Sequence, residues 1–204
     1  VDAEFGMAFE GADVLLNFAI DNVRFDNPGG CGGPDPVANP DAVFFDWDEN
    51  GAWWGAVTPE NDVAISLDGT NYGRANFQTG GTGFTDLFWR NDPSTFHGAN
   101  LVGNNLDDYV LKFEILTFDP IADGRFRLRF NSTTNGVDAF YDWAPWQETG
   151  EPFNTEGKWI TITIPVSVLG QPDFSQVNAE FGMAFQDADV LLNFAIDNVR
   201  FEEK

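Results

Sequence analysis

Apolar and polar residues alternate over several short stretches of the chain, with the period of two that is typical of β-strands. Residues 158–165, KWITITIP, show this pattern most clearly. Ile160, Ile162 and Ile164 fall on one side, the threonines between them fall on the other, and Pro165 ends the strand. One face of this strand is therefore expected to be buried.

The same period predicts further strands at residues 43–48, 62–68, 84–90, 109–117, 125–131, 180–185 and 190–201. In the last of these the alternation changes parity between Ile196 and Val199, which predicts a β-bulge near Asp197 and Asn198. No stretch keeps a helical period for more than a turn or two. Many short antiparallel strands predict an all-β fold, an antiparallel β-sandwich of the jelly-roll type.

A near-exact repeat sets the domain organisation. Residues 1–25 and 177–201 differ at only three positions: Asp2 against Asn178, Glu10 against Gln186, and Gly11 against Asp187. A repeat at the two ends of one stretch of domain size indicates tandem modules. Residues 1–25 are thus interpreted as the last two strands of a preceding repeat, residues 26–40 as a Gly/Pro linker, and residues 41–204 as one whole module.

Two strands bury too little apolar surface to be stable alone, so the leading tail must pack somewhere. Three arrangements are open. The tail can lie against its own module, take the place of the C-terminal copy, or enter a second molecule as a swapped element. The last arrangement predicts self-association through residues 1–25.

Charge narrows the range of partners. The formal net charge is −23, so nucleic acid and anionic bilayers would be repelled over most of the surface. No run of about 20 apolar residues is present, so this fragment is not expected to insert into a membrane. Cys31 is the only cysteine, which excludes an intrachain disulfide.

Residues for catalysis are sparse. His97 is the only histidine, so a Ser-His nucleophile or a zinc site of the usual kind lacks its parts. The alternating Glu-Xaa-Asp-Xaa-Glu strand of jelly-roll glucanases is absent from the sequence. With so many acids, a carboxylate pair at glycosidase spacing could still arise by chance. A noncatalytic protein is expected.

Tryptophan is abundant, with seven in the chain, and an indole face can stack on the C–H face of a sugar ring. Core packing is the alternative for each of them. Trp47 and Trp159 are expected to be structural, whereas flanking glycine or polar residues favour exposure of Trp53, Trp54 and Trp89. Adjacent strand residues face opposite ways, so of Phe88 and Trp89 we expect Trp89 to face outward. The candidate carbohydrate-binding residues are Trp53, Trp54, Phe88, Trp89, Arg90, Trp143 and Trp146.

Three arginines, Arg125, Arg127 and Arg129, share one face of a predicted strand. They could donate hydrogen bonds to sugar hydroxyls, or form a ladder of salt bridges with Glu114 and its neighbours. The ladder is the favoured interpretation. Asp46, Asp48 and Asn50 have the opening spacing of a calcium loop, but Val57 replaces the expected acid, so turn formation is the simpler interpretation.

Several segments together resemble a known family. They are VFFDWD at residues 43–48, YVLKFEI at 109–115, FYDWAPW at 140–146, FNTEGKWITITIPVSVL at 153–169 and AIDNVRF at 195–201. Over about residues 41–201 the chain resembles the C-terminal glycan-binding domain of Bacteroidetes surface glycan-binding proteins, most closely the xyloglucan-binding type. The resemblance implies a noncatalytic β-sandwich on an outer-membrane lipoprotein that captures polysaccharide.

The same resemblance implies where the aromatic platform lies. The family's tryptophan after the first strand matches Trp53 or Trp54, and its later aromatic pair matches Phe88 with Trp89. Sugar-binding jelly rolls often hold a structural Ca²⁺ ion, and Asp197 with Asp46 is the candidate pair here. A leading tandem tail departs from the family pattern and suggests a multivalent array.

The resulting hypothesis is a carbohydrate-binding module at the cell surface, extracellular or on the outer membrane, for a β-glucan such as laminarin or xyloglucan. A jelly-roll glycoside hydrolase or lyase is one alternative. A structural adhesin repeat is the other, and it would bury all of its aromatic residues.

Overall fold

The computed structural model describes residues 43–48, 54–81, 83–90, 108–132, 137–169 and 179–204. The repeat tail at residues 1–25 and the linker at residues 26–40 lie outside these ranges. Cys31, Trp53 and His97 lie outside them as well.

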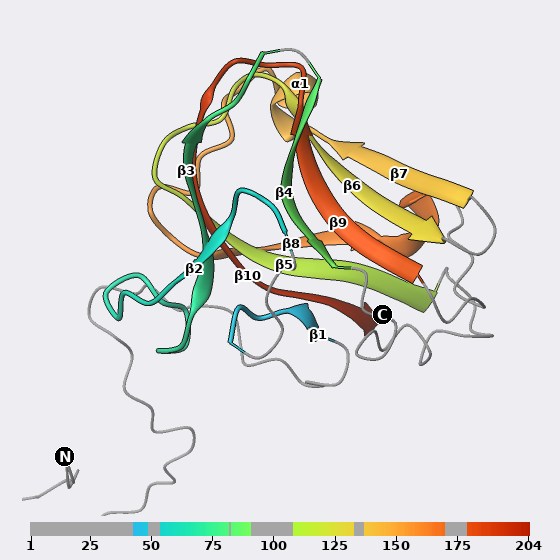
Figure 1. The fold of residues 1–204 in the computed structure, drawn as a ribbon, viewed down its shortest axis with the longest axis horizontal. Helices are drawn as coiled ribbons and strands as arrows, with labels where there is room; N and C mark the ends of the chain where they lie inside the picture. Colours follow the sequence, from blue (N-terminus) through green and yellow to red (C-terminus); the bar gives the residue numbers. More distant parts are fainter. Residues whose placement is uncertain (1–42, 49–53, 82, 91–107, 133–136, 170–178) are drawn as a thin grey trace, which may run out of the picture.

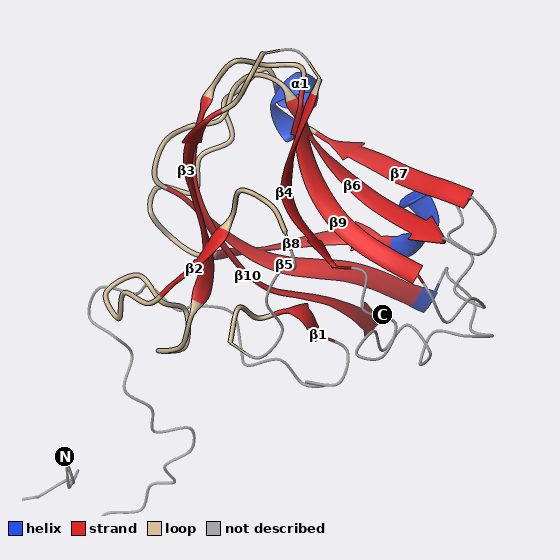
Figure 2. Ribbon diagram, viewed as in Figure 1, coloured by secondary structure: helices blue, strands red, loops and turns tan. Residues whose placement is uncertain are grey.

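Two antiparallel sheets face each other and form a β-sandwich (Figures 1 and 2), which confirms the predicted fold class. The larger sheet has the order β2-β3-β10-β5-β8, with β1 also paired to β10, and the smaller sheet has the order β4-β9-β6-β7. The six strands of the larger sheet are β1 (Val43–Phe45), β2 (Thr58–Glu60), β3 (Tyr72–Gln78), β5 (Tyr109–Thr117), β8 (Ile160–Pro165) and β10 (Leu191–Glu203).

The smaller sheet consists of β4 (Phe84–Arg90), β6 (Arg125–Ser132), β7 (Val137–Trp143) and β9 (Ala179–Gln186). One α-helical turn, α1 (Pro145–Thr149), follows β7, and a 3-10 turn (Val166–Leu169) follows β8. Every strand pair in both sheets is antiparallel. The described part of the chain contains no helix long and apolar enough to cross a bilayer.

Aromatic side chains from the two sheets meet in the core. The rings of Phe126 on β6 and Phe194 on β10 lie 5.6 Å apart, and those of Phe113 on β5 and Trp143 on β7 lie 5.7 Å apart, both edge to face. Phe126, Phe194 and Phe113 are fully buried. Full burial of such a side chain contributes about 1.5–3 kcal/mol, so these contacts hold the sheets together.

The predicted bulge in the last strand is confirmed. The pairing of β10 with β5 shifts register between Asp197 and Arg200, and Asn198 has a φ of 49°. Ile196 and Val199 are consequently both fully buried, although they are three residues apart. The bulge turns the strand so that both halves of it bury their apolar residues.

The strand predicted at residues 62–68 is wrong, because this segment forms turns outside the larger sheet. The side chain of Asp62 accepts a hydrogen bond from the amide of Ala64, and its carbonyl accepts from Ile65 and Ser66. Val63 is 70% exposed. Local hydrogen bonding by Asp62 therefore prevails over the alternation of three apolar residues.

Strand β3 was not predicted because its polar residues and Gly73 hide the alternation. A Cβ atom on Gly73 would lie 1.9 Å from Nε1 of Trp47, so the glycine makes room for the indole. Trp47 is 3% exposed and packs in the core, while Trp159 is half-buried against Tyr72 on the far side of the larger sheet. The structural roles predicted for Trp47 and Trp159 are confirmed.

Candidate functional site

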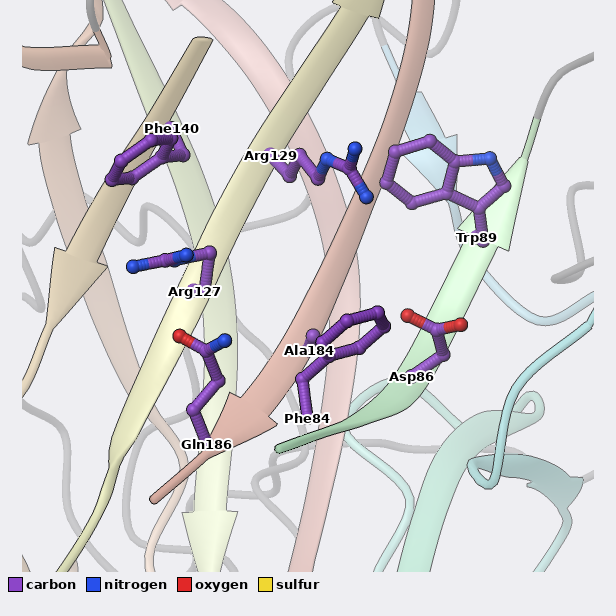
Figure 3. A pocket seen from close by; sticks show the side chains of 8 residues that line it. All are labelled: Phe84, Asp86, Trp89, Arg127, Arg129, Phe140, Ala184 and Gln186. Atoms are coloured by element: carbon purple, nitrogen blue, oxygen red, sulfur yellow. The ribbon is translucent and has the colours of Figure 1, made fainter. Parts of the chain in front are cut away.

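The outer face of the smaller sheet has the features of a binding surface. A pocket of about 190 Å³ opens there, and its lining comes from all four strands of that sheet (Figure 3). The lining residues are Phe84, Asp86, Trp89, Arg127, Arg129, Phe140, Ala184 and Gln186.

Strand pairing aligns several of these residues in one line across the sheet. Trp54 pairs with Trp89, Trp89 with Gly182, Gly182 with Arg129, and Arg129 with Phe140. Directly paired residues of antiparallel strands project on the same face. We call Trp54, Trp89, Gly182, Arg129 and Phe140 the cross-strand row.

A β-bulge in β4 places Trp89 on this face. The pairing of β4 with β9 shifts register between Asp86 and Phe88, so Leu87 and Phe88 both point into the core and are fully buried. Asp86 and Trp89 both line the pocket. Trp89 rather than Phe88 projects on the outer face, as expected, although simple alternation would have placed Trp89 opposite Asp86. The expected exposure of Trp89 is wrong, because its side chain is only 6% exposed.

Gly182, on the central strand β9, allows Trp89 to lie close to the sheet. A Cβ atom at this position would be 1.9 Å from Cε3 of Trp89, which is inside the ring's van der Waals contact. The indole therefore leans over β9, toward the guanidinium of Arg129, whose Cζ is 5.5 Å from the ring centroid (Figure 3). Ala184, the next residue of β9 that projects on this face, is also small, so side chains at the centre of the face rise little above the sheet.

Trp54 extends the row beyond β4. Its carbonyl accepts a hydrogen bond of 3.0 Å from the amide of Trp89, and the two indoles stack with centroids 6.1 Å apart. The amides of Ala56 and Val57 in turn donate hydrogen bonds to the carbonyls of Asp86 and Leu87 in β4. Trp54 is 45% exposed and Trp89 only 6%, so Trp54 offers the free indole face and Trp89 supports it from below.

Phe140 ends the row on the opposite edge strand. Its ring is 48% exposed, and the guanidinium of Arg127 lies 4.1 Å from the ring centroid. Phe84 is 59% exposed at the end of the same pocket. Sequence reasoning did not select either phenylalanine, although Phe140 must face outward once Trp143, three residues later, is assigned to the core.

Paired charges fix the arginines of β6. Arg127 donates two hydrogen bonds to Asp142, of 2.7 and 2.8 Å, and Arg125 forms ion pairs with Asp142 and Asp187. The bonds from Arg127 lower the pKa of Asp142 below its ordinary value. Asp142 therefore stays ionised, which makes it a poor general acid.

The expected salt bridge from these arginines to Glu114 is wrong. Glu114 lies on the outer face of the other sheet, where it binds Arg200 at 2.7 Å. Both side chains are almost fully buried there, and burial raises the pKa of Glu114. Arg125 and Arg127 do form salt bridges, but their partners are Asp142 and Asp187.

Three candidate binding residues are buried in the core instead of lying on the surface. Phe88 is fully buried, and Trp143 and Trp146 are 9% and 5% exposed. Trp146 donates a hydrogen bond from Nε1 to the carbonyl of Gly124, which satisfies the indole inside the fold. The structure does not bring these three rings together with Trp54, and sequence alone could not separate core tryptophans from exposed ones.

Arg90 ends β4, next to the row, but its side chain is outside the described part of the structure, as is the whole of Trp53. Their roles in binding stay predictions. The same holds for the binding roles of Trp54 and Trp89, whose positions the structure now defines.

The candidate calcium residues differ in their surroundings. Asp46 accepts a turn hydrogen bond from the amide of Asp48, whereas Asp197 is 1% exposed in the bulge of β10. Oδ1 of Asp197 accepts from the amide of Asn198, but Oδ2 is buried with no hydrogen-bond partner. Burial, together with the negative charges of Asp68 and other acids, raises the pKa of Asp197 to about 8.

An unpartnered buried carboxylate oxygen among acids is chemically suited to a cation. Within the described residues, however, no three His, Cys, Asp or Glu side chains cluster closely enough to hold a metal ion by themselves. An ion at Asp197 would need backbone or water oxygens as well.

The sequence and the fold match known proteins. Residues 37–203 match the sequence profile of a protein family. The family is described as "Surface glycan-binding protein B xyloglucan binding domain". No curated protein sequence matches the chain.

Among solved structures, SGBP-B from a complex xyloglucan utilization locus in Bacteroides uniformis has a TM-score of 0.54 at 13% identity, over 80% of this chain and 50% of that one. A structure with xylogluco-oligosaccharide has a TM-score of 0.51 at 14% identity, over 80% of this chain and 39% of that one. An exo-β-agarase has a TM-score of 0.52 at 11% identity, over 80% and 25% of the two chains. The chain spans half or less of the length of these three proteins, and at such identities the likeness concerns the fold alone.

Proposed function

We propose that this chain, which belongs to the family of surface glycan-binding protein B xyloglucan-binding domains, holds its polysaccharide on the outer face of the smaller sheet. One observation carries the proposal. All three exposed aromatic side chains of the described residues, Trp54, Phe84 and Phe140, are on this face. An adhesin repeat would have no reason to expose them together.

The chemistry of the face suits a sugar chain. Flat aromatic rings stack on the C–H faces of pyranose rings, and their rigid side chains lose little entropy on binding. Arg127, Arg129 and Gln186 supply hydrogen-bond donors for hydroxyl groups beside the rings. Noncatalytic capture needs no more than this, and the acid Asp142 is held ionised by two arginines.

The polysaccharide we propose is xyloglucan or another β-glucan such as laminarin. The family description and the neighbouring structure with xylogluco-oligosaccharide support xyloglucan. Affinity electrophoresis in gels that contain xyloglucan, laminarin or neither polymer tests this proposal. Retardation is expected in at least one polymer gel, and equal mobility in a broad polysaccharide panel would refute binding. Sugar release from the same polymers would instead support the glycoside hydrolase or lyase.

Matched variants locate the site. Trp54→Ala and Phe140→Ala remove exposed rings from the face, while Val63→Ala and Leu191→Ala remove apolar groups elsewhere that are at least as exposed. Combining the first pair in one protein is expected to abolish retardation, and combining the second pair to leave it unchanged. Unchanged retardation of the Trp54→Ala/Phe140→Ala protein would place the site elsewhere.

Tandem repetition is a further part of the proposal. Residues 1–25 preserve every residue that β9 and β10 bury in the core, and Gly11 stands where Asp187 adopts a φ of 63°, a value that glycine adopts more easily. We therefore infer a preceding module with the same final strands, so that several weak sites act together. Strand exchange through residues 1–25 would appear as dimers in size-exclusion chromatography that vanish when residues 1–25 are removed.

We place the protein at the cell surface, on the outer membrane, because capture of an extracellular polymer requires it and the family is one of surface proteins. Protease treatment of intact cells is expected to degrade it. Protection from protease until lysis would contradict this location.

Calcium at Asp197 also remains a proposal, supported by the unpartnered Oδ2. Added Ca²⁺ is expected to raise the melting temperature of the wild-type protein but not of Asp197→Asn. An equal response, or none in either protein, would exclude this role.

A further inference from the structure

The two copies of the repeated segment differ where β9 ends, beside the pocket. Within the described part of the second copy, residues 179–201, only Gln186 and Asp187 differ from their counterparts, Glu10 and Gly11. Every residue that β9 and β10 bury in the core is the same in both copies. The copies therefore share one core and differ on the surface of the smaller sheet.

Of the two differing residues, Gln186 lines the pocket and Asp187 does not. The side chain of Gln186 extends toward Arg127 (Figure 3), and its Oε1 is buried with no hydrogen-bond partner among the described residues. The carboxylate of Asp187 instead forms an ion pair of 2.5 Å with Arg125, which is not a lining residue. The side chain at position 186 is thus placed to meet a ligand, and the one at position 187 is not.

The pocket lining has a positive net charge, although the chain as a whole carries −23. It contains the guanidinium groups of Arg127 and Arg129 and one carboxylate, that of Asp86. The acids that pair with arginines of β6, Asp142 and Asp187, are not lining residues. A ligand in the pocket therefore meets more guanidinium groups than carboxylates.

The sequence of the first copy moves one carboxylate into this lining. It has a glutamate at the position of Gln186 and a glycine at that of Asp187, so the number of acids is unchanged. The acid leaves the position that pairs with Arg125 and joins the lining beside Arg127. A glutamate also lacks the N–H donors of a glutamine amide, so it cannot donate to a ligand oxygen.

We propose, building on the function above, that residues 186 and 187 set the charge preference of each module. The pocket of this module accepts a glycan that carries a carboxylate, such as that of a uronic acid, beside Arg127. The pocket of a module that ends in the first copy excludes the same group. Like charges in close contact at a protein surface repel strongly enough to change an affinity about tenfold. Tandem modules with one fold then bind differently substituted stretches of a polysaccharide.

Isothermal titration with xyloglucan and laminarin tests this inference, each in its native form and with primary hydroxyl groups oxidised to carboxylates. Gln186→Glu/Asp187→Gly reproduces the first copy and keeps the net charge. Wild type is expected to bind the native and carboxylated forms of its polymer within about threefold of each other, and the variant to bind the carboxylated form about tenfold more weakly than wild type. Affinity for the native form should be unchanged.

Two further proteins complete the experiment. Asn76→Asp converts an exposed amide on β3 of the larger sheet into an acid, and this matched control should bind as wild type does. Gln186→Glu alone places the same carboxylate in the lining and keeps Asp187, so it should show the same selective loss if the double variant fails to fold.

The outcomes separate this inference from the proposed function. An equal loss for native and carboxylated polymer, no loss for either, or a wild-type protein that binds only the native form would overturn the charge preference and leave glycan binding intact. Failure of wild type to bind any of the polymers would overturn both.

Discussion

Replacing Asp197 with asparagine is expected to stabilise the fold at neutral and alkaline pH. The carboxyl group is 1% exposed, and its Oδ2 has no hydrogen-bond partner. Burial raises its pKa from 3.8 to about 8, with the acids Asp68, Glu114 and Asp48 adding to the shift. Asparagine keeps the acceptor for the amide of Asn198 and cannot ionise.

The sign and the size of the change in the free energy of unfolding follow from the linkage between protonation and folding. Because the folded-state pKa exceeds the unfolded one, the native state holds a proton that the unfolded state releases above about pH 4. The stability that the bound proton contributes is fully present below about pH 4 and is lost as the pH rises through about 8. Each pKa unit is worth about 1.4 kcal/mol, which sets a ceiling of about 6 kcal/mol. Relaxation and water entry around a buried charge reduce this, so we expect about 2–4 kcal/mol.

Urea unfolding of both proteins at pH 5, 7 and 9, without divalent cations, measures the effect. Wild-type stability should fall with rising pH and Asp197→Asn stability should fall much less, so the difference grows toward pH 9. Burial raises the pKa of Glu114 too, but this contribution is common to both proteins. Parallel pH curves would refute the assignment of a buried neutral carboxyl group to Asp197.

Two other substitutions test the packing on each sheet. Gly182→Ala should displace the indole of Trp89, because the new Cβ would lie 1.9 Å from its ring, and should weaken binding of xyloglucan about tenfold in titration calorimetry. Unchanged affinity would mean that Trp89 does not support the site. Arg200→Met should destabilise the protein by about 3–5 kcal/mol in urea unfolding, because it leaves Glu114 buried and ionised without its partner. The double variant Arg200→Met/Glu114→Gln should recover much of that loss, and no recovery would argue against the ion pair as the cause.

Alternation of apolar residues predicted well those strands that pair with a regular strand on each side in the sheet. Residues 109–117 and 125–131 are β5 and β6 within a residue or so, and the parity change at Asp197 correctly predicted the bulge of β10. Residues 62–68 failed because Asp62 bonds its own turn. Strand β3 was not predicted because Gly73 interrupts its pattern. This glycine makes room for the indole of Trp47, which is distant in sequence.

The candidate site was only half predictable for a related reason. Trp54 has a local signal, since neighbouring glycine favours a surface position, and it is 45% exposed. The polar neighbours of Trp89 predicted the same exposure, but this ring is 6% exposed. Phe140 and Arg129 matter because strand pairing brings them into line with Trp89 across Gly182, and pairing is a property of the fold. The burial of Phe88, Trp143 and Trp146 depends on the bulge in β4 and on contacts between the sheets, which the local pattern does not record.

Titration calorimetry of the Trp54→Ala/Phe140→Ala double variant with xyloglucan is the most direct test of the aromatic face. We predict that binding falls below detection while the urea unfolding midpoint stays at the wild-type value, since both rings are about half exposed. The Val63→Ala/Leu191→Ala control should bind as wild type does. Wild-type affinity in the Trp54→Ala/Phe140→Ala protein would contradict the account.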